Sequence, residues 1–132
     1  MTSSVGVSAY LADSWLNTLN NVAFVVPAAY FGLFTGIPGA SGTSNASATT
    51  LRVPGTFAAA SGGSFGFTGL PPIWSAAVAA ETLTHIAAFS GAYGDPDAQF
   101  LFSGALLVPK TVAEGDQIAL GNFALSFMTL AS

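Results

Sequence analysis

Few side chains in this chain are suited to chemistry, and they are far apart in the sequence. The sole histidine, His85, lies in a run of apolar residues. Because a metal site or a catalytic triad needs several partners in a fixed geometry, a single histidine within a strand is more often a hydrogen-bonded core or rim residue. We therefore interpret His85 as structural.

The acidic residues include one local pair, Asp95 and Asp97, on either side of Pro96. Two loop aspartates would supply only part of the oxygen shell that calcium requires, so the pattern favours a solvated turn over an ion site. Glu81 is a further carboxylate, but nothing in the sequence sets the carboxylate separation that glycoside hydrolysis needs. The Gly-rich run 61–64 lacks the Gly-Lys-Ser/Thr ending of a phosphate-binding loop. The sequence therefore predicts no enzyme, no metal site and no cofactor.

Two residues are candidates for contacts with a neighbouring protein. Arg52 lies between two apolar residues, so its guanidinium points to the face opposite theirs and could form a bidentate pair with an acid across a subunit contact. A surface arginine on an edge strand is at least as good an interpretation. Trp74 follows a Pro-Pro bend and is either a core residue or an interface anchor, and we favour the core.

Charged residues make up only 6% of the chain, against about 25% in an ordinary soluble domain. The surface must therefore consist largely of small polar and apolar side chains, and large exposed apolar patches usually mark interfaces. We expect this chain to be buried in an oligomer or a larger assembly. With two basic residues and a net charge of −4, it is poorly suited to binding nucleic acid. The absence of cysteine excludes disulfides and thiolate metal sites.

The length of 132 residues fits one domain, residues 1–132. No membrane segment is expected, because the longest apolar run, Val22–Leu33, is interrupted by Pro27 and is shorter than the ~20 residues that a spanning helix needs. The N-terminus lacks the basic residues of a secretory signal. Residues 1–7 show no pattern and are expected to form an extended arm, either frayed or docked on a neighbouring subunit.

A short helix is predicted directly after this arm. Ser8 can cap it, because its hydroxyl would accept hydrogen bonds from amides of the first turn. Asn20 and Asn21 are suited to its end, since asparagine tolerates the left-handed conformation there. The apolar stripe of this helix is expected at Leu11, Trp15 and Leu19, with Leu16 beside them.

From Val22 onward the pattern is that of β-strands. Strands are predicted at 30–35, 50–53, 56–58, 65–68 and 81–89, with Pro54 between the second and third and a long Gly/Ser-rich loop at 36–48. In the strand 81–89, one face is expected to carry Leu83, His85, Ala87 and Phe89.

The C-terminal third, Gln99–Met128, is predicted to be an antiparallel pair with one buried face. Its first strand is 99–108, a polar turn at 109–116 contains Gly115, and the second strand ends at 123–128, with Phe123, Leu125 and Phe127 on one face. Many short strands with one terminal helix predict a mainly β fold, a single antiparallel β-sandwich or small barrel.

Several segments together resemble a group of small virion proteins of tailed bacteriophages, labelled tail-fibre-like or minor capsid proteins, some of which decorate the head. The resemblance rests on Trp15–Leu19, Tyr30–Thr35, Thr84–Phe89, Leu101–Leu106 and Pro109–Asp116. It implies a structural role without catalytic residues.

The resemblance and the composition lead us to predict a structural virion protein that decorates the outside of a tailed-phage capsid as an oligomer, with a trimer as one option. Its expected partners are the major capsid protein and further copies of itself, after synthesis in the host bacterial cytoplasm. The acidic balance favours the outer surface over the DNA-facing one. The alternatives are a tail or fibre component and a stand-alone carbohydrate- or ligand-binding β-sandwich module.

Overall fold

The computed structural model describes residues 6–26, 28–62, 64–69, 71–120 and 124–126. The chain begins with helix α1 (Ala9–Asn17) and a 3₁₀ turn, η1 (Thr18–Asn20). The strands are β1 (Ala29–Phe34), β2 (Val53–Gly55), β3 (Ser64–Gly66), β4 (Ile73–Trp74), β5 (Glu81–Phe89), β6 (Phe100–Val112), β7 (Ile118–Ala119) and β8 (Ala124–Ser126). The predicted fold class, mainly β with one short N-terminal helix, is confirmed, and the described strands form no closed barrel.

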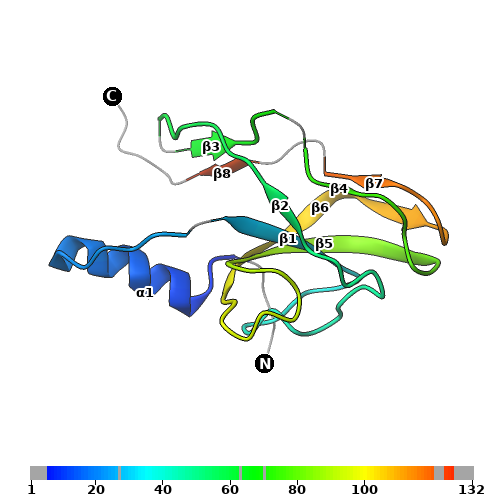
Figure 1. Cartoon of the computed structure of the whole chain (residues 1–132), viewed down its shortest axis with the longest axis horizontal. Helices are drawn as coiled ribbons and strands as arrows, with labels where there is room; N and C mark the ends of the chain where they lie inside the picture. The colour runs from blue at the N-terminus through cyan, green and yellow to red at the C-terminus, as the bar shows by residue number, and fades with distance from the viewer. Residues whose placement is uncertain (1–5, 27, 63, 70, 121–123, 127–132) are drawn as a thin grey trace.

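The strands are arranged around one four-stranded antiparallel sheet in the order β2-β1-β5-β6 (Figure 1). Two small antiparallel pairs, β3–β8 and β4–β7, accompany it. The predicted strands 30–35 and 81–89 correspond to β1 and β5, which pair directly, with Gly32 opposite Ala87. These two strands form the middle of the sheet and carry most of its buried residues.

The main core lies on one face of this sheet. Phe31 is fully buried at its centre, with ring centroids 6.0 Å from Phe57, 5.4 Å from Phe67 and 6.2 Å from Phe102. All three contacts have the edge-to-face geometry that aromatic pairs prefer. The other buried members of this core are Leu11, Ala29, Leu33, Trp74, Ala77, Leu83, Ile86, Ala88, Leu101, Phe102, Val112 and Ile118.

A second, smaller core lies on the opposite face and consists of Phe34, Ala87 and Phe89, with Phe100 packed against them. The loop between β1 and β2 packs against it, because Gly42 lies directly against the ring of Phe100, and the backbone amides of Thr35 and Ser47 tie the loop to β1 by donating to Asn45 and Leu33. The predicted long loop 36–48 is therefore confirmed as a loop, and it serves as a lid on the sheet.

The side chains of β5 do not all face as predicted. Leu83 packs in the main core with Ile86 and Ala88, whereas Ala87 and Phe89 belong to the second core. The pairing register with β6 shifts between Leu83 and His85, and such an irregularity breaks strict alternation. The expectation that Leu83 shares a face with Ala87 and Phe89 is wrong for this reason.

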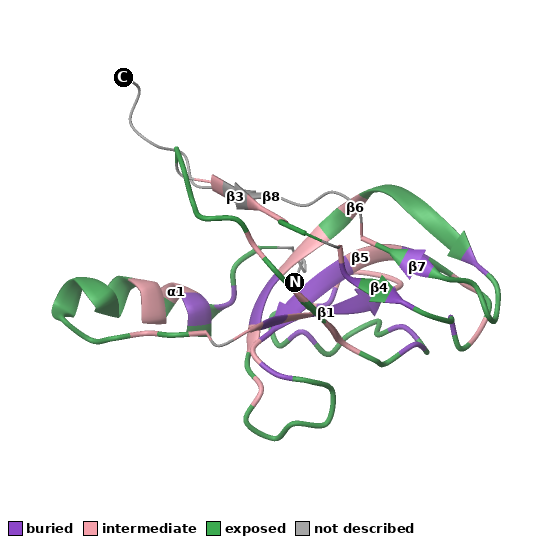
Figure 2. Cartoon of the chain, turned by 45° about the horizontal axis from the view of Figure 1, so that its top comes forward, coloured by how far each residue is buried: buried purple, intermediate pink, exposed green. Residues whose placement is uncertain are grey.

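The same irregularity shapes β6. Leu83 pairs with Lys110 and His85 with Ala105, so the segment Leu106–Pro109 lies opposite Thr84 alone. We call this segment the β6 bulge. In Figure 2 this half of β6 is mostly exposed, in contrast to the buried start of the strand.

The helix forms where the sequence predicts it. The Ser8 hydroxyl accepts from the Leu11 amide at 3.1 Å, and Asn21 adopts the left-handed conformation after η1. The apolar stripe is only partly buried, because the helix points away from the sheet (Figure 1): Leu11 is buried, but Leu19 is 85% exposed. No helix in the described ranges is long and apolar enough to cross a bilayer.

The predicted C-terminal hairpin is wrong in its pairing. Strand β6 pairs with β5 and runs on through Pro109 to Val112, so the turn is confined to Ala113–Asp116, where Gly115 has a φ of 93°. The later segments pair elsewhere, β7 with β4 and β8 with β3. An alternating pattern identifies a strand but does not identify its neighbour. Phe123, Phe127 and Met128 lie outside the described residues.

One smaller expectation is also corrected, and the predicted arm is described only in part. Pro54 does not separate two strands but lies inside β2, at the edge of the sheet, where a missing N–H is tolerated. In the arm, residues 1–5 lie outside the described residues, whereas Val7 forms a bridge with Phe102 and Gly6 accepts from the Ser103 amide. The described end of the arm therefore docks on its own sheet.

The central position of Phe31 yields a stability prediction. Replacing Phe31 by alanine is expected to destabilise the fold by about 3–5 kcal/mol, because it removes a fully buried ring and leaves a cavity. The matched control is Leu107→Ala, which removes an entirely exposed side chain and is expected to change stability by less than about 0.5 kcal/mol. Urea unfolding followed by circular dichroism measures both, and equal midpoints for the two variants would contradict the assignment of the core.

Candidate assembly surfaces

The residues considered for catalysis or metal binding do not converge. Within the described ranges, no three His, Asp or Glu side chains gather closely enough to hold a metal ion. His85 is half-buried, and its Nδ1 lies 2.8 Å from the hydroxyl of Thr84. This contact with the adjacent residue fits the structural interpretation of His85.

The carboxylates make local contacts instead of forming one cluster. Asp95 accepts from the backbone amide of Asp97 at 2.9 Å, which is the geometry of a turn capped by its own aspartate. Glu81, at the start of β5, accepts from the Ser47 hydroxyl and from the Ala48 amide. Each of these two acids therefore stabilises the loop beside it.

Trp74 is fully buried in the main core. Its indole N–H donates to the carbonyl of Leu51 at 2.8 Å, which satisfies the one polar atom of the ring. The side chain is covered by residues of its own chain, as the core interpretation predicts. A direct contact with a neighbouring protein would require those residues to move.

Arg52 is half-buried and lies on the second face of the sheet. Its Cζ atom is 3.6 Å from the centroid of the Phe89 ring and 5.5 Å from that of Tyr93. Burial lowers the pKa of the guanidinium, and Tyr93 opposes this effect. The sequence placed Arg52 opposite its apolar neighbours but contained no signal for this ring stacking, which depends on tertiary packing.

The largest group of exposed apolar residues lies on the segment 9–26, which we call the helical projection. The segment after η1 returns along the helix, since the ring of Phe24 packs edge-on against Tyr10 at 5.9 Å. The exposed apolar residues of this projection are Tyr10 (43%), Leu16 (63%), Leu19 (85%), Val22 (53%) and Val25 (78%). Asp13 is its one charged residue. Sequence reasoning identified the helix and placed Leu19 in its apolar stripe, but it gave no sign that this residue is exposed.

The β6 bulge is a second exposed apolar surface. Leu107 is 100% exposed and Val108 71% exposed. The register shift turns these side chains away from the chain's own core, although the sequence reads as a continuous apolar strand. Exposed apolar groups of this kind are typical of surfaces that meet another protein.

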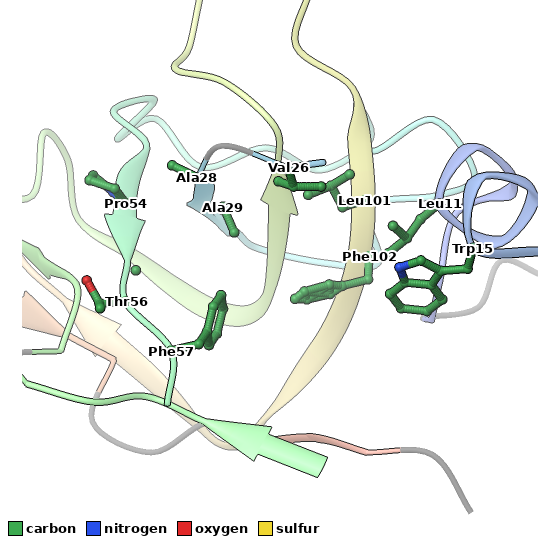
Figure 3. A pocket seen from close by; sticks show the side chains of 11 residues that line it. Leu11, Trp15, Val26, Ala28, Ala29, Pro54, Thr56, Phe57, Leu101 and Phe102 are labelled. Carbon is green, nitrogen blue, oxygen red and sulfur yellow. The ribbon is translucent and has the colours of Figure 1, made fainter. Parts of the chain in front are cut away.

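An apolar hollow of about 630 Å³ lies at the base of the helical projection, between α1 and the sheet. Figure 3 shows Trp15, Phe57 and Phe102 around it, with Leu11 and Leu101 beside them. Of the residues that line it, only Thr56 has a polar group beyond the indole nitrogen of Trp15, and none is ionisable in the physiological range. Such a lining suits apolar contact and not acid–base chemistry.

The family model described as "Podophage GP4 fiber I protein gp80" matches residues 6–127. The chain belongs to this Gp80 family. No curated protein matches it. The match spans α1 and all strands of the sheet, and it confirms the expected resemblance to small virion proteins of tailed phages. As a Gp80-family member, the chain is a bacteriophage structural protein of the virion, with a β-rich fold.

The separation of the titratable groups yields a prediction for His85. The variant His85→Gln is expected to keep the wild-type stability within about 0.5 kcal/mol and to associate like the wild type, because among the described residues the His85 ring forms a hydrogen bond with its sequence neighbour Thr84 alone. Thermal unfolding and sedimentation measure the two properties. Loss of association with unchanged folding would show that His85 has a functional role.

Proposed function

We propose that this protein is a structural subunit of a fibre on a tailed-phage virion and that its copies associate through exposed apolar surfaces. The observation that carries the proposal is the match of residues 6–127 to a family described by a fibre protein. That description favours the fibre alternative over decoration of the capsid, and it supplies no argument for the major capsid protein as the partner.

The surface chemistry supports self-association. The helical projection and the β6 bulge expose branched apolar side chains in a chain whose charged fraction is 6%. Fully burying one such side chain is worth about 1.5–3 kcal/mol. Several of them together offset the cost of association, which is of the order of 4–15 kcal/mol.

The accessible surface of the chain is also large enough for an interface of ordinary size. A standard interface buries about 800 Å² on each partner, which is roughly a tenth of the 8057 Å² surface of this chain. The helical projection extends from the sheet (Figure 1), so it can reach a neighbouring copy without any rearrangement of the core. We further propose that the role is mechanical and not catalytic, because the acids and the histidine make separate, local contacts.

The proposal predicts that the double variant Leu16→Gln, Leu19→Gln associates at least about tenfold more weakly than the wild type, since about 1.4 kcal/mol corresponds to a factor of ten. Sedimentation equilibrium measures the association. The matched control is Asn17→Gln, Asn20→Gln, which changes exposed polar residues of the same projection and is expected to associate like the wild type. A wild-type chain that stays monomeric at every concentration would contradict self-association.

The location on the particle needs a separate measurement. Gold-labelled antibody against the protein, viewed on intact phage by electron microscopy, is expected to label fibres. Labelling confined to the capsid would overturn the fibre assignment and restore decoration as the better reading.

A further inference from the structure

A second hollow, of about 240 Å³, lies on the face of the sheet opposite the helical projection. The long loop after β1 and the loop after β5 both contribute to its wall. Unlike the apolar hollow, it contains a cation, Arg52, with the aromatic side chains of Phe89 and Tyr93 beside it and the hydroxyls of Thr43 and Thr50 at its wall. This combination points to a ligand that is partly polar and carries a negative charge.

The guanidinium of Arg52 is held in place but is not saturated. The Phe89 ring supports one face at 3.6 Å, and Nη1 donates to the carbonyls of Gly91 at 3.3 Å and Ala92 at 3.5 Å. Within the part of the chain that the structure describes, Nε and Nη2 of Arg52 have no acceptor. Every side-chain nitrogen there that is fully buried does have a hydrogen-bond partner. Nε and Nη2 are therefore at least partly exposed, on a side chain that lines the hollow. A guanidinium presents them as a planar fork that matches a carboxylate.

The charge of Arg52 is also unbalanced. Among the described residues its partners are two carbonyl oxygens and two aromatic rings, and no carboxylate contacts it. Desolvation lowers the pKa of the side chain, which expresses the cost of holding a cation away from water without a counter-charge. An anion supplied from outside the chain would remove that cost.

The rest of the hollow selects among possible anions. Tyr93 is 61% exposed, so its ring is available at the rim, and an aromatic ring offers a flat apolar face beside polar groups. The side chain of Thr50 is exposed, and among the described residues that of Thr43 bonds only to Ser41. An acidic side chain of a neighbouring copy would use the guanidinium alone, whereas a sugar ring with a carboxylate would also use the ring and the hydroxyls.

We propose that this hollow binds a carboxylate-bearing sugar of the uronic acid class, with Arg52 pairing with the carboxylate and Tyr93 stacking on the sugar ring. The site goes beyond the proposed fibre role and lies within a single chain. Its binding therefore does not depend on whether the copies assemble. A uronic acid unit of a bacterial surface polysaccharide has the required chemistry.

The test is a titration of the full-length protein with D-glucuronate and D-galacturonate, followed by the backbone amide signals of Arg52 and Tyr93 in NMR spectra. The neutral counterparts, glucose and galactose, differ only at C6, and acetate supplies the carboxylate without the ring. We expect at least one uronate to bind at least about tenfold more tightly than its neutral counterpart and than acetate, in line with the strength of a charge-assisted hydrogen bond.

The variants separate the contributions of charge and ring. Arg52→Met keeps an unbranched stem over Phe89 but removes the charge, and it is expected to weaken uronate binding at least about tenfold. Tyr93→Ala removes the exposed ring and is expected to weaken it less. The matched control is Lys110→Met, which removes the only other lysine or arginine of the chain and is expected to leave binding unchanged.

Several results would overturn the proposal. These are no uronate binding, equal binding of the neutral sugars, or an equal loss in Lys110→Met, which would indicate nonspecific attraction to positive charge. Two results together would instead assign Arg52 to a carboxylate of a neighbouring copy. Acetate would bind as tightly as the uronates, and Arg52→Met would dissociate the oligomer in sedimentation. Uronate binding by a chain that fails to form fibres would leave this site standing and refute only the fibre role.

Discussion

The burial of β5 on both of its faces is the constraint on which the rest of the structure depends. From Ile86 to Phe89 every side chain is buried, alternately in the main core and in the second core. Two adjacent alanines, Ala87 and Ala88, keep the strand thin enough for layers to pack on both sides. An antiparallel sheet with one wet face would not need a second cover, whereas this one needs the long loop after β1 to exclude water from Phe34 and Phe89.

The burial of β5 on both faces also explains where the Arg52 side chain and the exposed apolar side chains lie. The aromatic ring that closes the second core, Phe89, is the same ring that supports the guanidinium of Arg52. The main core takes up Leu11, with Trp15, Phe24 and Val26 packed against it, and leaves the other apolar side chains of the helical projection exposed. Most of the exposed large apolar side chains of the described residues therefore lie on the helical projection and the β6 bulge.

The parts of this fold that depend on neighbouring residues could be predicted from the sequence, and the parts that depend on distant pairing could not. The cap at Ser8, the left-handed Asn21 and the strand 81–89 follow from local chemistry and alternation. The partner of β6 was predicted wrongly, because both candidate neighbours are apolar alternating strands and the pattern does not rank them. The stacking of Arg52 on Phe89 joins residues of different strands, so no spacing in the sequence reveals it. The fibre family was reached only as an alternative, since low charge indicates assembly without indicating which assembly.

The edges of the four-stranded sheet have a consequence for how this chain can polymerise. On one side, β2 is three residues long and contains Pro54; on the other, Gly6 and Ser8 occupy the start of β6, and the β6 bulge interrupts its ladder farther on. Neither margin offers a long, flat template for strand addition of the kind that propagates amyloid. In the proposed assembly, contacts between copies of this chain would therefore be made by side chains and not by strand addition.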